Sequence, residues 1–164
     1  IKDSGSGSDV LRDLGIPSGL PRDSIPDLPT RLDIYHKLIS TRTLDAAQLL
    51  ESELIDRFGS LPWQVENLLF SLRLKITTIG SGIESIQRIG DRIILQFPYE
   101  IQSSRKIFEG ILGEKWKIGN MQIRSTISQL GTEWEKTLYA VIETLSDFKR
   151  DMEKRLDESA LIQS

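Results

Sequence analysis

The chain has 164 residues, of which 38% are hydrophobic and 27% charged, and this composition fits one globular domain rather than a disordered protein. Its formal net charge of −3, with Lys and Arg scattered among Asp and Glu, argues against direct nucleic-acid binding, which needs a basic surface. The absence of cysteine excludes disulfides, thiolate catalysis and cysteine-based zinc sites, and it fits a reducing cytosol.

Residues 1–24 are expected to form a flexible or extended linker. The first part is rich in Gly and Ser and lacks the hydrophobic core of a signal peptide. Pro17, Pro21 and Pro26 then each favour extended backbone in the residue before them. No apolar run approaches the roughly 20 residues that span a bilayer, so no membrane contact is expected. Because the sequence opens on Ile1 rather than Met, we expect a fragment of a longer protein.

Residues 28–79 are predicted to form three consecutive helices. Asp27 is placed to cap the first helix and Thr43 to cap the second. The second helix is expected to end at Gly59, and the third to begin at Pro62. The apolar faces predicted by helical spacing are Leu28, Leu32, Tyr35 and Leu38 in the first helix and Val65, Leu68, Leu69, Leu72, Ile76 and Ile79 in the third.

The hydrophobic period changes after the third helix. Residues 83–127 are predicted to form two β-hairpins, with turns at Gly90-Asp91 and Gly119-Asn120, around a short helix. A long closing helix is predicted over residues 132–158. The inward residues expected in these two helices are Ile107, Phe108, Ile111 and Leu112, and then Trp134, Leu138, Val141, Leu145, Phe148, Met152 and Leu156.

The fold class predicted from these elements is α+β. It combines a three-helix N-terminal part, a small antiparallel sheet of two hairpins around a short helix, and a long C-terminal helix. Residues 25–158 are expected to form one domain, and residues 159–164 a disordered tail.

No motif indicates an enzyme. The sequence has neither a phosphate-binding P-loop nor the Ser-centred elbow of the α/β-hydrolases. His36 is the only histidine, so a histidine-based metal triad is impossible, and we interpret it as an ordinary exposed residue. Acidic pairs such as Asp147 with Asp151 are interpreted as solvated surface. We therefore expect no catalytic residue, cofactor or metal in this chain.

The second helix carries the surface that most resembles a binding site. Glu53, Asp56 and Arg57 lie at i, i+3 and i+4 on the side opposite its apolar residues, and Leu49 lies among them. One interpretation is an exposed Glu–Arg pair beside an incidental leucine. The other is a charged docking face with one apolar contact. The spacing alone leaves both open.

The run Glu-Leu-Ile-Asp-Arg-Phe-Gly-Ser-Leu-Pro at 53–62, with the helices on either side of it, resembles the C-terminal domain of bacterial transcription-repair coupling factors. The resemblance is strong over residues 25–75 and continues more weakly to Leu156. It implies that the parent is a large DNA translocase of the bacterial cytoplasm, whose motor binds ATP and magnesium upstream of this domain.

In that family the C-terminal domain is non-catalytic. It packs on the N-terminal UvrB-like module, hides the surface that binds UvrA, and restrains the motor until RNA polymerase is engaged. The family's contacts in the Glu-Leu-Ile-Asp-Arg segment fall here on Glu53, Asp56 and Arg57. The resemblance thus favours the docking interpretation of the same face.

Two functions follow as hypotheses. The leading one is an autoinhibitory docking domain, expected to be monomeric and to bind no nucleic acid directly. The alternative is an accessory nucleic-acid-binding domain that stacks bases on Trp116 or Tyr99. The basic residues that would surround this stacking site are Arg92, Lys115, Lys117 and Arg124. A DNA-binding domain must lose affinity steeply as salt rises, which separates the two hypotheses.

Overall fold

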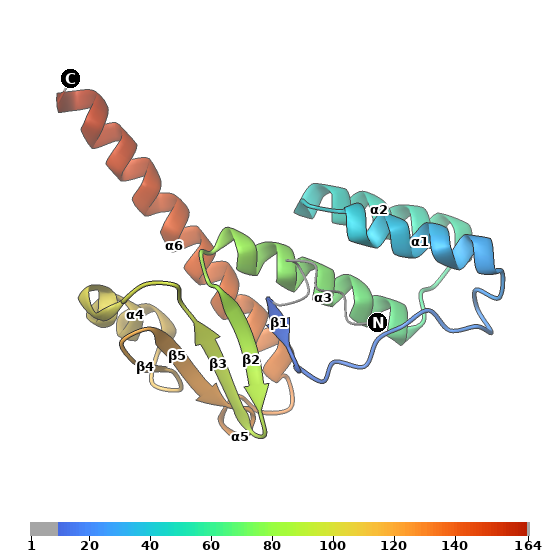
Figure 1. Ribbon diagram of the computed structural model, residues 1–164, viewed down its shortest axis with the longest axis horizontal. Coiled ribbons are helices and arrows are strands. Elements are labelled where there is room, and N and C mark those ends of the chain that lie inside the picture. The colour runs from blue at the N-terminus through green and yellow to red at the C-terminus, as the bar shows by residue number, and fades with distance from the viewer. Residues whose placement is uncertain (1–9, 164) are drawn as a thin grey trace. The chain divides into compact units, whose positions relative to one another are not determined.

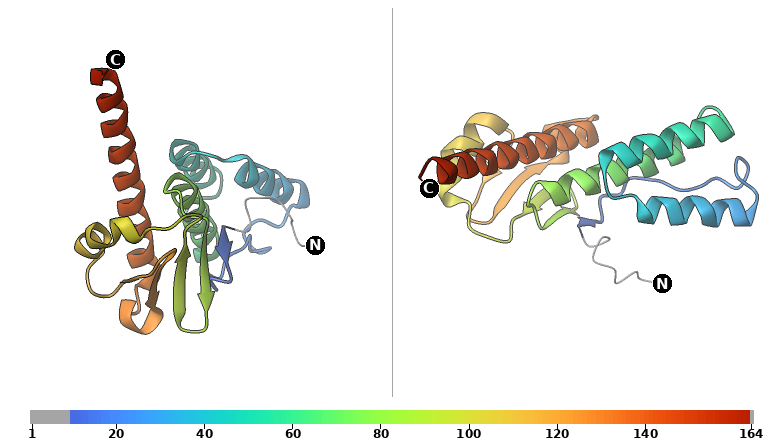
Figure 2. Two further views of the ribbon diagram at one scale, coloured as in Figure 1. Left: turned by 60° about the vertical axis from the view of Figure 1, so that its left-hand side comes forward. Right: turned by 90° about the horizontal axis from the view of Figure 1, so that it is seen from above.

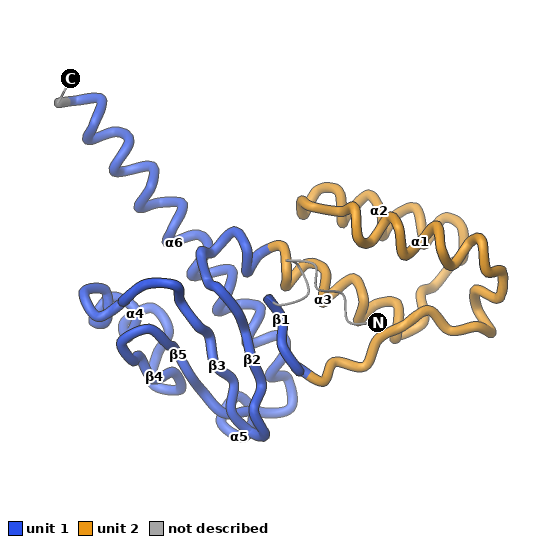
Figure 3. Tube along the Cα trace, in the orientation of Figure 1, with its two compact units in different colours: residues 1–14, 77–164 blue, residues 15–76 orange. Residues whose placement is uncertain are grey.

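The computed structural model describes residues 10–163 and divides them into two compact units (Figure 3). Residues 15–76 form one, which we name the helical unit. The described parts of residues 1–14 and 77–164 form the other, which we name the sheet unit. The predicted α+β class is confirmed, although the single domain expected over residues 25–158 is divided between these units.

The helical unit holds the three predicted helices (Figure 1). They are α1 (Leu28–Ser40), α2 (Leu44–Phe58) and α3 (Trp63–Gly80), whose last turn belongs to the sheet unit. Asp27 and Thr43 cap α1 and α2 as predicted, because each side chain accepts a backbone N–H three residues ahead at 3.1 Å. Gly59 ends α2 with a φ of 76°, a left-handed conformation that glycine adopts without strain.

The core of the helical unit draws on all three helices. Its buried residues are Leu20, Ile25, Ile34, Ala47, Leu50, Leu54, Val65, Leu69 and Leu72. The predicted face of α1 is only partly right, because Leu38 packs against this core whereas Leu28, Leu32 and Tyr35 are exposed. Ile34 takes the central position instead.

The segment predicted to be a linker is packed from Val10 onward. Its first nine residues lie outside the described part of the chain. Leu11 and Arg12 form a short strand, β1, that pairs in parallel with another strand of the sheet, and Leu14 and Leu20 are buried. The sequence of this extended segment has no regular hydrophobic pattern. It nevertheless belongs to the fold, because burying these leucines is favourable.

The sheet unit contains a five-stranded sheet in the order β1-β2-β3-β5-β4. The elements after β1 are β2 (Ser85–Ile89), β3 (Arg92–Gln96), the 3-10 turn η1 (Gln102–Ser104), α4 (Arg105–Leu112), β4 (Lys117–Ile118), β5 (Gln122–Thr126), α5 (Ile127–Leu130) and α6 (Trp134–Gln163). Both predicted hairpins are confirmed, and antiparallel pairing of β3 with β5 joins them into one sheet.

Helix α6 crosses one face of the sheet and then extends beyond it (Figures 1 and 2). Trp134, Leu138 and Leu145 are buried as predicted, whereas Met152 and Leu156 are exposed because they lie past the sheet. The residues expected to form a disordered tail, as far as Gln163, are instead the last turns of this helix. In the short helix α4, only Phe108 is fully inward, and Ile107 and Ile111 are exposed.

Among the helices of residues 10–163, none is both long enough and apolar enough to cross a membrane.

The cap of α1 gives a testable dependence on pH. Thr30 donates both its hydroxyl and its backbone N–H to Asp27, which lowers the pKa of that carboxyl below its ordinary value of 3.8. The cap therefore stabilises the fold above pH 3.8 and is lost as the pH falls through the lower, folded-state pKa. We expect Asp27→Ala to lower the melting temperature at neutral pH, with a difference from wild type that shrinks in acid.

Thermal melts followed by circular dichroism across this pH range measure the effect. Asp27→Ser is the matched control, since serine also caps helices but does not titrate there. If Asp27→Ala melted like wild type at neutral pH, the cap would have no role in stability.

Candidate protein-docking surface

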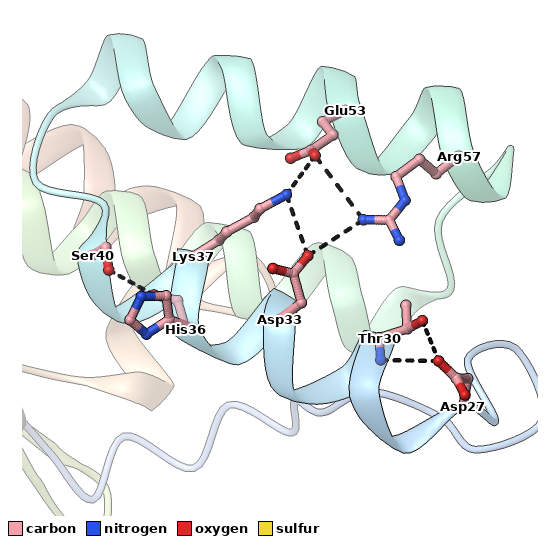
Figure 4. Close-up of polar contacts among 8 residues, drawn as sticks. All are labelled: Asp27, Thr30, Asp33, His36, Lys37, Ser40, Glu53 and Arg57. Atoms are coloured by element: carbon pink, nitrogen blue, oxygen red, sulfur yellow. Dashed lines mark hydrogen bonds and ion pairs between the residues drawn. The ribbon is translucent and has the colours of Figure 1, made fainter.

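Four charged side chains join α1 to α2 (Figure 4). Lys37 on α1 donates to Glu53 Oε1 on α2 at 2.6 Å and lies 3.3 Å from Asp33 Oδ2. Arg57 Nη1 on α2 lies 3.6 Å from the same Asp33 oxygen and 4.0 Å from the same Glu53 oxygen. We name these four residues the ion-pair cluster. The cations and anions alternate around it, so each charge has two neighbours of opposite sign.

The ion-pair cluster is half-exposed, with between 36% and 48% of each side chain accessible. Pairs at this exposure contribute little to stability because water screens them. Glu53, and then Asp33, raise the pKa of Lys37 above its usual 10.5. A raised pKa of this kind contributes stability that is present below 10.5 and lost only at more alkaline pH. Lys37 therefore stays charged throughout the neutral range.

Arg57 is held in place but its hydrogen-bonding capacity remains available. Its contacts with Asp33 and Glu53 are longer than hydrogen bonds, and no hydrogen bond from its guanidinium is found in the described part of the chain. The guanidinium also lies 5.1 Å from the centre of the Phe58 ring, which fixes its plane by a cation–π contact. Five N–H donors in a fixed orientation suit a carboxylate on another surface.

Asp56 and Leu49 lie on the outer side of α2, away from its buried residues. Leu49 is 72% exposed. Asp56 is exposed and forms no ion pair within residues 10–163. An unpaired carboxylate beside an accessible leucine offers a partner both a charge and an apolar contact without breaking any bond inside this domain.

The four residues predicted from the sequence therefore divide into two pairs. Asp56 and Leu49 occupy the outer face as expected, but Glu53 and Arg57 lie on the flank that faces α1. Helical spacing on α2 alone could not show this, because it does not tell where the neighbouring helix lies. Asp33 and Lys37 were missed, although an acid and a base at i and i+4 are a recognisable pair.

The two aromatic residues proposed to stack on nucleic-acid bases differ in their exposure. Trp116 is only 4% exposed, so it cannot stack on a base, and this part of the alternative is wrong. Tyr99 is 51% exposed and packs beside Phe97. His36 is exposed, as expected. Within the described chain, no three His, Cys, Asp or Glu residues come together as a metal site would require.

Comparison with known proteins places the chain in a family. The model of the TRCF domain matches residues 14–107, which is more than half of the chain. The chain belongs to the TRCF domain family. The resemblance to the C-terminal domain of transcription-repair coupling factors is thereby confirmed, and the matched family is not that of a motor domain.

Similar proteins are named transcription-repair-coupling factor. That of Bacillus subtilis is 26% identical over 152 residues, which cover 84% of this chain and 13% of the relative. That of Escherichia coli K12 is 40% identical over 75 residues, 46% of this chain and 6% of the relative. That of Staphylococcus aureus USA300 is 35% identical over 106 residues, which cover 65% of this chain and 9% of the relative. This TRCF domain chain thus spans only a small part of its curated relatives.

The fold of the TRCF domain is also found in a solved structure, a crystal structure of the C-terminal domain of transcription-repair coupling factor. It superposes with a TM-score of 0.67 at 23% identity, covering 85% of this chain and 91% of the other. The likeness supports the fold of both units described above.

Proposed function

We propose that this TRCF domain is a non-catalytic regulatory domain of a bacterial transcription-repair coupling factor that works by reversible docking. It docks on the N-terminal UvrB-like module of the parent, masks the surface that binds UvrA, and restrains the ATP-dependent motor until RNA polymerase is engaged. ATP and magnesium belong to that motor and not to this domain.

The observation that carries this proposal is the outer face of α2. Asp56 is an unpaired, accessible carboxylate, and Leu49 beside it is a large apolar side chain that no neighbour covers in the described structure. The ion-pair cluster holds Arg57 next to this face with donors to spare. A surface of this composition can form a polar interface with a small apolar centre.

The modest size of this face suits a contact that must be released. A few charged contacts around one leucine can be given up when the partner rearranges, whereas a large hydrophobic interface would hold permanently. The ion-pair cluster also needs no rebuilding after release, because its bonds are made within the domain.

A titration with the separately produced UvrB-like module of the parent tests the proposal. We expect the wild-type chain to bind it with an affinity that falls as salt is raised. Leu49→Asp is expected to bind more weakly by more than about 1 kcal/mol, the loss that marks a residue important to an interface. Leu156→Asp makes the same change at an exposed leucine on the end of α6, away from this face, and serves as the control. Equal affinities for wild type and Leu49→Asp would remove this face from the docking surface.

The nucleic-acid alternative keeps one supporting observation. One face of the sheet exposes three basic residues, Arg92, Lys117 and Arg124. Lys117 pairs with Arg124, and Arg92 lies two residues before Ile94, the other partner of Arg124, so all three share this face. Because Trp116 is buried, this face presents positive charge to a nucleic acid but not the tryptophan that was expected to stack on its bases. Fluorescence anisotropy with single-stranded DNA at low and moderate salt decides the matter, since tight, steeply salt-dependent binding would support the alternative.

A further inference from the structure

Helix α1 is apolar on two sides. Ile34 and Leu38 contact the core of the helical unit. The outer side carries Leu28, Leu32, Tyr35 and Ile39, with exposed fractions of 62%, 58%, 38% and 67%. We name these four residues the outer stripe. A surface helix usually has one apolar side, which faces the core, and a second, exposed apolar side is typical of an interaction surface.

The outer stripe has the geometry of a helix-packing seam. Its residues follow one another at intervals of four, three and four, which is the a/d spacing that lets side chains of one helix insert between those of another. Asp33 and Lys37 turn toward α2 (Figure 4), and His36 lies at the edge of the stripe. Within residues 10–163, no ion pair crosses the stripe. A second helix can therefore lie along it without breaking salt bridges.

The size of the outer stripe indicates which kind of helix this is. It consists of four exposed residues, whereas a stable interface between separate proteins uses roughly 20–30 residues per partner. A second copy of the chain would therefore bind weakly. A helix joined to the same polypeptide needs less area, because its effective concentration reaches about the millimolar range.

We infer that the outer stripe of α1 receives an amphipathic helix from another part of the same parent polypeptide. Relatives extend far beyond the matched region, since this chain spans 13%, 6% and 9% of the three compared above. The inference rests on the part of the proposed function that places the chain within such a parent. It does not depend on the docking of Leu49 and Asp56, which lie on another helix.

Single-cysteine labelling in the full-length parent tests this inference, and the chain itself contributes no competing thiol. Ile39→Cys reports on the outer stripe and Leu49→Cys on the proposed docking face. Each is labelled with a maleimide in the isolated chain, in the native parent and in the urea-unfolded parent, and the labelled peptide is identified by mass. A helix that covers the stripe nine-tenths of the time slows labelling of Ile39→Cys about tenfold in the native parent.

The matched variants add a second arm. Leu32→Asp places a charge in the seam and is expected to restore fast labelling of Ile39→Cys, whereas Leu32→Met keeps the apolar contact and leaves labelling slow. Circular dichroism of the isolated chain confirms that both variants fold.

Each outcome of the labelling has a defined meaning. Equal labelling of Ile39→Cys in the isolated chain and the native parent overturns the inference. Protection in the isolated chain that grows with its concentration also overturns it, in favour of a second copy. Slow labelling of Leu49→Cys alone supports the proposed function without the outer stripe, and slow labelling of Ile39→Cys alone supports the stripe without the proposed docking face.

Discussion

Replacing Asp56 by lysine in the full-length coupling factor is expected to weaken docking of this domain by about 2–5 kcal/mol, the usual loss when one member of a desolvated charge pair is removed. The physical reason is that the partner's charge is left buried and faces a like charge. Release of the domain then appears as tighter UvrA binding and faster ATP turnover without RNA polymerase. Equilibrium binding and steady-state ATPase assays measure both.

Asp56 is a cleaner target than a reversal of Glu53, Asp56 and Arg57 together. Glu53 and Arg57 also bind Lys37 and Asp33, so changing them disturbs the contact between α1 and α2. Asp56 has no such bond in the described structure, and an exposed substitution usually changes stability by no more than about 0.5 kcal/mol.

Two controls accompany the Asp56 experiment. Asp157→Lys makes the same change on the exposed end of α6 and should leave UvrA binding unchanged. In a parent whose docking face is already disrupted by Leu49→Asp, adding Asp56→Lys should have little further effect. Identical UvrA affinity and ATPase rate for wild type and Asp56→Lys, with the domain folded, would exclude Asp56 from the mechanism.

Leu138→Ala is expected to lower the free energy of unfolding of the sheet unit by about 2–5 kcal/mol, because it leaves a cavity where α6 packs on the sheet. Leu138 is fully buried. One turn before it on α6, the Trp134 ring has the Arg88 guanidinium 5.7 Å from its centre, so this end of α6 is fixed to the sheet unit. Chemical denaturation followed by tryptophan fluorescence measures the loss.

Leu156→Ala removes the same atoms from the same helix beyond the sheet. Leu156 is exposed, so the expected change is within about 0.5 kcal/mol. Comparable losses for the two variants would mean that the extended end of α6 is packed in solution and contributes to the fold.

Local signals in the sequence were sufficient for most of the fold. Caps at Asp27 and Thr43, the glycine at the end of α2 and the two hairpin turns all act within a few residues, so they can be read without knowing the tertiary structure. The long-range pairing of β1 with β2 has no local signal, and a two-residue strand is too short to show a period.

The orientation of α1 could not be predicted for a different reason. Helical spacing identifies an apolar side, but α1 has two, and only packing decides that Ile34 faces the core while Leu32 does not. For a similar reason, the sequence predicted only part of the candidate site. The run from Glu53 to Arg57 identified the right helix, and the position of α1 beside it determined which of these charges remain open to a partner.

The pairing of β1 with β2 has a mechanical consequence. It places the described residues before Leu14 in the sheet unit, so the helical unit is an insertion whose two ends both return to that unit. Tension applied to the chain through Val10 passes across the Val10–Ile86 hydrogen bond into the sheet before it reaches the inserted helices. Because only Leu11 and Arg12 pair with β2, at the edge of the sheet, we expect β1 to detach under tension before the core around Ile34 unfolds.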